Sequence, residues 1–224
     1  MEGLFMVKKP VLTMLLTAAV YVALLKVMSL VRISYLIGSK HLCFSASQAV
    51  APLTGAFLGL GGISMVFGLR TIMQLAGTGL HINLTLYHIP TFFASFYWRS
   101  DKRLFTIGVP ILCMLLFVLH PQGSGAWMYS LYWLIPPLCA LKKNKSILLT
   151  ALGSTFTAHA VGSIIWLYCL GLPTAAWIGL IPMVAVERLL NTLVLVGAYT
   201  LVKSTKSVIL KVWRTRTRPQ SSLT

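Results

Sequence analysis

The sequence predicts an all-α membrane protein, a six-transmembrane helical bundle with one further hydrophobic segment in its first external loop. Of the 224 residues, 57% are hydrophobic and only 10% are charged, and the apolar residues form runs long enough to cross a bilayer. A disordered basic arm lacks this apolar fraction, a disulfide-rich secreted domain needs more cysteines, and a soluble enzyme needs more polar surface. We therefore expect a single integral membrane domain over 1–224.

The apolar runs define the expected helices. Six are taken as transmembrane, and a seventh run is the additional segment; they cover 11–31, 82–98, 104–119, 126–141, 147–170 and 175–202, with the seventh at 49–69. Pro52 and five glycines weaken run 49–69 as a straight helix, which favours a re-entrant or interfacial hairpin. The alternative is an ordinary glycine-rich transmembrane helix packed through Gly55 and Gly59.

The charges predict the orientation of these helices. The chain has 19 Lys and Arg against three Asp and Glu, a net charge of +16, and its bases gather at 8–9, 99–103, 142–145 and 203–218. The positive-inside rule makes these clusters cytoplasmic, whereas 120–125 and 171–174 contain no base and are expected outside. Both basic ends then lie in the cytoplasm, which requires an even number of crossings. Localisation in a bacterial cytoplasmic (inner) membrane is expected, with 203–224 as a basic cytoplasmic tail.

The last expected helix carries an ionisable cluster near its middle. An ionised side chain at that depth costs about 2.5–3.5 kcal/mol on insertion scales, so Glu187 and Arg188 should face the bundle interior or a wet cavity. Asn191 follows one helical turn later and borders the same surface. We expect these three side chains to bind substrate; a purely structural polar clamp is the alternative.

Helix 147–170 carries a polar stripe. Thr155, His159, Ser163 and Trp166 recur at helical spacing and stack on one face. Hydroxyl groups, an imidazole and an indole together suit a small heterocyclic ligand. The alternative for His159 is a hydrogen bond between helices.

Four aromatic residues begin the helix expected at 126–141. Trp127 and Tyr129 fit an interfacial aromatic belt, whereas Tyr132 and Trp133 lie deeper and are expected to line the substrate pocket. In the first loop, Arg70, His81 and His88 are candidates to close that pocket. Near the end of the first helix, Lys26 is expected to snorkel towards the interface.

No cofactor, metal site or disulfide is expected. His41 and Cys43 lack two further ligands at suitable spacing, and the remaining cysteines are isolated in apolar helices. No G-x-x-x-x-G-K-[ST] stretch is present to bind ATP phosphates. Any energy for active transport must therefore come from partner proteins.

Several motifs together indicate a family resemblance. Helix 11–31 contains an A-x-x-x-A step, Ala19 to Ala23, that lets another helix approach closely. Further stretches are His88-Ile89-Pro90, Tyr132-Trp133-Leu134-Ile135-Pro136-Pro137 and His159-Ala160-Val161-Gly162-Ser163-Ile164-Ile165-Trp166. With six crossings and a long first external loop, the chain resembles the substrate-binding S component of energy-coupling factor (ECF) vitamin transporters, although run 49–69 departs from the family plan.

The resemblance implies a function and a set of partners. The chain would capture a small water-soluble vitamin or related heterocycle, with Ala19 and Ala23 facing a transmembrane coupling T component and two cytoplasmic ATPase subunits supplying energy. The lipid bilayer is a further partner, with anionic headgroups near the basic tail, and nucleic acid is not expected. The alternatives are an intramembrane enzyme acting on lipid or peptide, and a non-transporting structural subunit. A rhomboid-type enzyme is disfavoured because Ser154 and His159 lie on different faces of one helix.

Overall fold

A computed structural model gives the fold and describes residues 9–35, 43–78, 84–99, 102–142 and 146–216. This part of the chain is almost entirely helical, with one short antiparallel strand pair. By length and composition, four helices can cross a membrane: Val11–Met28, Leu53–Gly77, Ile147–Leu170 and Thr174–Ser207. The predictions of a helical fold and of a membrane protein are therefore confirmed.

The elements follow one another along the chain with few long connections. In order they are α1 (Lys9–Met28), β1 (Arg32–Tyr35), β2 (Cys43–Ser45), α2 (Ala46–Val50), α3 (Leu53–Thr78), η1 (Leu84–His88), α4 (Ile89–Arg99), η2 (Leu104–Gly108), α5 (Val109–Leu119), α6 (Pro121–Ser124), η3 (Trp127–Leu134), α7 (Ile135–Leu141), α8 (Ile147–Leu170) and α9 (Thr174–Arg216). The α8 bounds coincide with the predicted run 147–170.

Three of the predicted helices begin with a distorted segment, and each distortion has a proline as its cause. η1 and η2 are π-helical and η3 is a 3₁₀ helix. Pro90, Pro110 and Pro136 follow directly at the starts of α4, α5 and α7. Because proline has no N–H, the carbonyl four residues earlier loses its helical partner, and in all three cases that carbonyl lies inside the distorted segment.

Run 49–69 forms α2 and the first part of α3, and the chain bends between them. Gly59 interrupts α3 with φ 68° and ψ −171°, a conformation that a residue with a side chain rarely adopts. Beyond this break α3 is regular to Thr78. The predicted segment is therefore not one straight helix.

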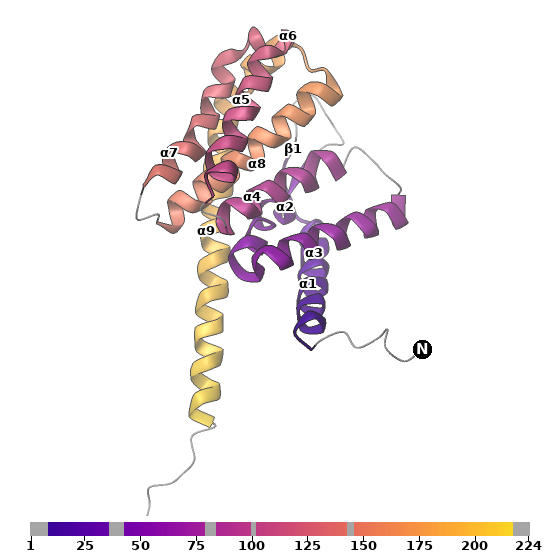
Figure 1. Cartoon of the computed structure of the whole chain (residues 1–224), viewed down its shortest axis with the longest axis vertical. Coiled ribbons are helices and arrows are strands. Elements are labelled where there is room, and N and C mark those ends of the chain that lie inside the picture. Colours follow the sequence, from indigo (N-terminus) through magenta and orange to yellow (C-terminus); the bar gives the residue numbers. More distant parts are fainter. Residues whose placement is uncertain (1–8, 36–42, 79–83, 100–101, 143–145, 217–224) are drawn as a thin grey trace, which may run out of the picture.

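Helix α9 is longer than the predicted 175–202. Its 43 residues correspond to about 64 Å, roughly twice the hydrocarbon thickness of a bilayer. The first part of the predicted basic tail is thus a continuation of this helix as far as Arg216. Figure 1 shows the yellow end of α9 standing apart from the rest, with the start of α1 towards the same end of the molecule and α6 at the opposite end.

Helix α8 is central, and its contact with α4 is unusually close. Gly153 leaves room for the ring of Tyr97, which lies directly over it. The Tyr97 hydroxyl donates a buried hydrogen bond of 2.7 Å to the carbonyl oxygen of Pro136, and Ser154 Oγ donates one of 2.9 Å to the carbonyl oxygen of Ala94. These bonds fix α4 and α7 against α8.

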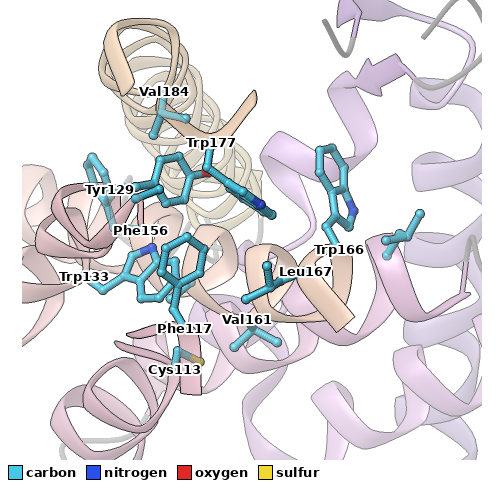
Figure 2. Close-up of a cluster of buried hydrophobic side chains, with 13 residues drawn as sticks. Cys113, Phe117, Tyr129, Trp133, Phe156, Val161, Trp166, Leu167, Trp177 and Val184 are labelled. Carbon is cyan, nitrogen blue, oxygen red and sulfur yellow. The ribbon is translucent and has the colours of Figure 1, made fainter. Parts of the chain in front are cut away.

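The buried side chains form two clusters. The aromatic cluster joins α5, η3, α8 and the start of α9, and includes Phe117, Tyr129, Trp133 and Trp177. Figure 2 shows these four gathered together, with Trp166 set apart from them. The second cluster joins α1, α2, α3, the start of α8 and the middle of α9. Because α8 and α9 contribute to both clusters, they connect the two halves of the bundle.

Candidate functional site

A cavity lies between α8, α9, α2 and the start of α4. It encloses about 840 Å³ of atom-free space, its open mouth included, of which about 90 Å³ can be occupied by the centres of water-sized molecules. Apolar walls come from Pro52, Leu86, Pro90, Leu180 and Val184. Most of its polar groups come from α8 and α9, the two helices that link the buried clusters. We call this space the first cavity.

The predicted stripe on α8 faces the first cavity. Thr155, His159, Ser163 and Trp166 all line it, as expected for residues spaced along one helical face. Thr155 Oγ1 also lies 3.2 Å from Thr192 Oγ1, in a hydrogen bond between α8 and α9. The stripe therefore gives the cavity a polar wall and fixes that wall against α9.

The predicted cluster on α9 reaches the same cavity. Glu187, Arg188 and Asn191 line the wall opposite the α8 stripe. The closest Arg188 and Glu187 atoms, Nη2 and Oε2, lie 3.6 Å apart, and Arg188 is only 8% exposed. Because the pair lies at the edge of the cavity, its charges are available to a ligand as well as to each other. A molecule here would meet both a carboxylate and a guanidinium group.

Buried polar atoms at this cavity include two that have no hydrogen-bond partner among the described residues. They are Nε2 of His159, on α8, and Oε1 of Gln48, on α2. Buried polar groups are nearly always hydrogen-bonded, and leaving one unsatisfied costs about 1–3 kcal/mol. A ligand or water in the cavity would satisfy both atoms.

The aromatic residues of η3 divide differently from the prediction. Tyr129, expected in an interfacial belt, is buried at the first cavity, where its hydroxyl lies 3.2 Å from Ser163 Oγ. Tyr132 donates from its hydroxyl to the carbonyl oxygen of Ile181 at 2.9 Å. Trp133 is fully buried in the aromatic cluster. Neither Tyr132 nor Trp133 lines the cavity, so they support its wall from behind, whereas the exposed Trp127 keeps a position that suits an interface.

The residues expected to close the pocket lie elsewhere or outside the described part. Arg70 and His88 line a second cavity next to the first, and His81 is among the residues that the structure does not describe. Lys26 also lines the second cavity. Ala19 and Ala23 are exposed on α1, so the described chain leaves their face open.

Ser154 and His159 do not form a nucleophile–base pair. The Ser154 hydroxyl donates to the Ala94 carbonyl oxygen at 2.9 Å, away from the imidazole.

Among the described side chains no group of three or more His, Cys, Asp and Glu lies close enough together to hold a metal ion. Cys113 and Cys139 are buried and Cys169 is exposed, all as free thiols.

Sequence reasoning missed two residues of the first cavity. Gln48 precedes the apolar run 49–69 and carried no motif, although an amide next to a membrane-buried segment is itself a signal of a polar interior. Tyr129 was expected at the interface because of its position at the helix start.

Comparison of the chain with protein-family models, curated proteins and solved structures finds no match in any of the three.

Proposed function

We propose that this chain is the substrate-capture subunit of an ECF-type transporter, taking up a small water-soluble vitamin or related heterocycle. The observation that carries the proposal is the first cavity, where polar side chains of α8 and α9 converge on one space and His159 Nε2 and Gln48 Oε1 have no partner among the described residues. The aromatic faces of Tyr129 and Trp166 suit a planar ring, and Glu187 with Arg188 suits a charged or strongly polar substituent.

The proposal includes six membrane crossings and one re-entrant segment, with both termini in the cytoplasm. Three contacts support a segment that descends and returns beside α1. Ala46 N–H donates to the Val31 carbonyl oxygen at the end of α1, and the Tyr21 hydroxyl donates to the Val50 carbonyl oxygen at 3.0 Å. Gly61 then lies beside Met14, close to the start of α1. The backbone break at Gly59 precedes the return along α3.

The binding test uses the full chain, purified in detergent, and radiolabelled thiamine, riboflavin and biotin. We expect at least one of these to bind, and Glu187→Gln and Asn191→Ala to weaken its Kd by about tenfold or more, as loss of a hydrogen bond at a charged group predicts. Thr200→Ala is the matched control, since Thr200 is an exposed residue of the same helix outside the cavity. Unchanged affinity in both cavity variants would show that the first cavity is not the binding site.

The partner test concerns the exposed face of α1. A T component would pack closely on Ala19 and Ala23, so replacing either with leucine should reduce co-purification with a T component and its ATPases while leaving ligand affinity intact. Thr17→Leu is the control, because Thr17 is exposed on α1 and points about 160° away from Ala19 and about 120° away from Ala23 around the helix. Undiminished assembly of the Ala19 and Ala23 variants would remove the docking surface from the proposal.

A further inference from the structure

A second cavity lies beside the first, between the end of α1, the strand-to-α2 turn and the outer part of α3. It encloses about 940 Å³ of atom-free space, its mouth included. Ser45, Gln48 and Tyr87 line both cavities, so the two are separated only by these shared side chains. A ligand that displaces these side chains could contact both cavities.

The second cavity contains two bases and no acid. Lys26, exposed in the last turn of α1, and Arg70, partly buried in α3, both line it, and both helices are apolar and long enough to span a membrane. Glu187 is the one acidic residue in the described part of the chain, and it faces the first cavity. The loops 36–42 and 79–83 contain neither Asp nor Glu in their sequence. Positive charge at such a site is unfavourable unless a counter-charge accompanies it.

The neighbouring groups are mostly suited to donating hydrogen bonds. The one hydrogen bond that Arg70 makes within the described residues is a long one of 3.5 Å from Nη1 to Thr91 Oγ1, which leaves most of its five N–H donors for a ligand. Nδ1 of His88 is buried without a partner among those same residues. Ser29 and Ser47 also line the cavity, but the Ser29 hydroxyl donates to the Lys26 carbonyl oxygen at 2.6 Å and the Ser47 hydroxyl shares a 2.8 Å hydrogen bond with that of Ser45. Carboxylate and phosphate oxygens are the acceptors that such a set of donors binds best.

We propose that the second cavity binds a carboxylate or phosphate group carried by the same ligand whose ring occupies the first cavity. This inference rests on the proposed function and narrows its substrate class to anionic heterocycles. The shared wall of Ser45, Gln48 and Tyr87 favours a substituent of the ligand over an independent anion, because one molecule then contacts both cavities.

The first experiment tests the anion site alone. Thermal unfolding of the detergent-purified chain is measured with sodium phosphate replacing sodium chloride at constant ionic strength. Phosphate at ten times its Kd should raise the unfolding midpoint by about 3–6 °C. The shift should be lost in Arg70→Gln and Lys26→Gln, and kept in Arg32→Gln, which removes an exposed charge from β1 outside both cavities. No shift, or an equal shift in the Arg70 variant, would overturn the inference.

The second experiment tests whether the anion belongs to the ligand. Nicotinate is compared with nicotinamide, and pyridoxine 5′-phosphate with pyridoxine, since each pair differs in the anionic group. The anionic member should bind about tenfold or more tightly, and Arg70→Gln should abolish that preference. Equal affinities within the pairs would overturn the inference yet leave the proposed function standing. Conversely, the Glu187→Gln test decides the proposed function and does not depend on Arg70.

A lipid headgroup is the competing source of a phosphate. The phosphate-dependent shift is therefore repeated in nanodiscs of phosphatidylcholine with and without phosphatidylglycerol. We expect the same shift in both. If phosphatidylglycerol abolishes the shift in the unsubstituted protein, the second cavity binds lipid and the inference is overturned.

Discussion

Replacing Gly153 with alanine should destabilise the protein, whereas the same replacement at Gly162 should not. Both glycines lie next to side chains of α4, Gly153 beside Tyr97 and Gly162 beside Pro90. A methyl group on Gly153 would overlap the ring of Tyr97, but one on Gly162 would lie 3.5 Å from Cγ of Pro90, an ordinary van der Waals contact. The two substitutions are chemically identical, so the difference between them measures how tightly α4 and α8 pack.

The expected magnitudes follow from these contacts. Alanine is favoured over glycine within a helix by about 0.5–1 kcal/mol, so Gly162→Ala should be neutral or slightly stabilising. At Gly153 the ring of Tyr97 must move, and overpacking of this kind costs about 1–3 kcal/mol. The buried 2.7 Å hydrogen bond from Tyr97 to Pro136 would also break, at a further cost of about 1–3 kcal/mol. Less the helix-propensity gain, the net loss for Gly153→Ala is about 1–5 kcal/mol.

The assay is equilibrium unfolding in mixed dodecyl maltoside and SDS micelles, followed by tryptophan fluorescence. In a Tyr97→Ala background, Gly153→Ala should cost much less, because the methyl group then enters the space left by the ring. Equal unfolding free energies for Gly153→Ala and Gly162→Ala would refute the close packing of α4 on α8. That result would also remove the support for the wall of the first cavity.

Three further predictions concern other parts of the fold. Trp177 is fully buried with its ring centroid 5.2 Å from that of Phe117, so Trp177→Ala should lower the unfolding free energy by about 3–5 kcal/mol and Trp177→Phe by clearly less, in the same unfolding assay. Ser146 accepts a 3.3 Å hydrogen bond from the first turn of α8, so Ser146→Ala should cost about 0.5–2 kcal/mol, and no measurable loss would contradict the cap. In a cysteine-free background, a cysteine at Ser124 should react with an impermeant maleimide from outside intact cells, whereas one at Lys142 should react only after permeabilisation; the reverse pattern would invert the orientation.

The apolar runs and the bounds of α8 were predictable because local signals determine them. Run 147–170 is bounded by Ser146, whose side chain caps the helix start, and by Gly171, whose left-handed conformation ends it. The polar stripe on this helix was equally predictable, since regular α-helical spacing decides which side chains share a face. For the same reason the sequence indicated Glu187, Arg188 and Asn191 together.

The arrangement of η3 was not predictable from the same periodicity. The segment is a 3₁₀ helix, in which side chains three apart lie on one line. Met128, Leu131 and Leu134 accordingly form its exposed row. An α-helical period of 3.6 residues does not give this row. The α-helical period also could not predict that Tyr129 lines the first cavity whereas Trp133 packs behind it.

The second cavity was not predictable because its residues come from segments that pair only in the folded chain. Lys26 alone suggests a snorkelling side chain, and Arg70 alone suggests a loop residue. Their common cavity depends on the bend at Gly59 and on the return of α3 beside α1. No helical period connects two such residues, and without homologous sequences no co-variation signals the contact.

The charges that line the two cavities give the reason for proposing an anionic ligand rather than a cationic one. Lys26, Arg70 and Arg188 carry three positive charges into apolar spanning helices, and Glu187 carries one negative charge. With histidines neutral, the cavities hold a net charge of +2. A cationic ligand would add to this excess, whereas a ligand with one or two negative charges would offset it where desolvation makes uncompensated charge most costly. Under the same proposal, Glu187 would accept hydrogen bonds from the ring portion of the ligand beside Arg188.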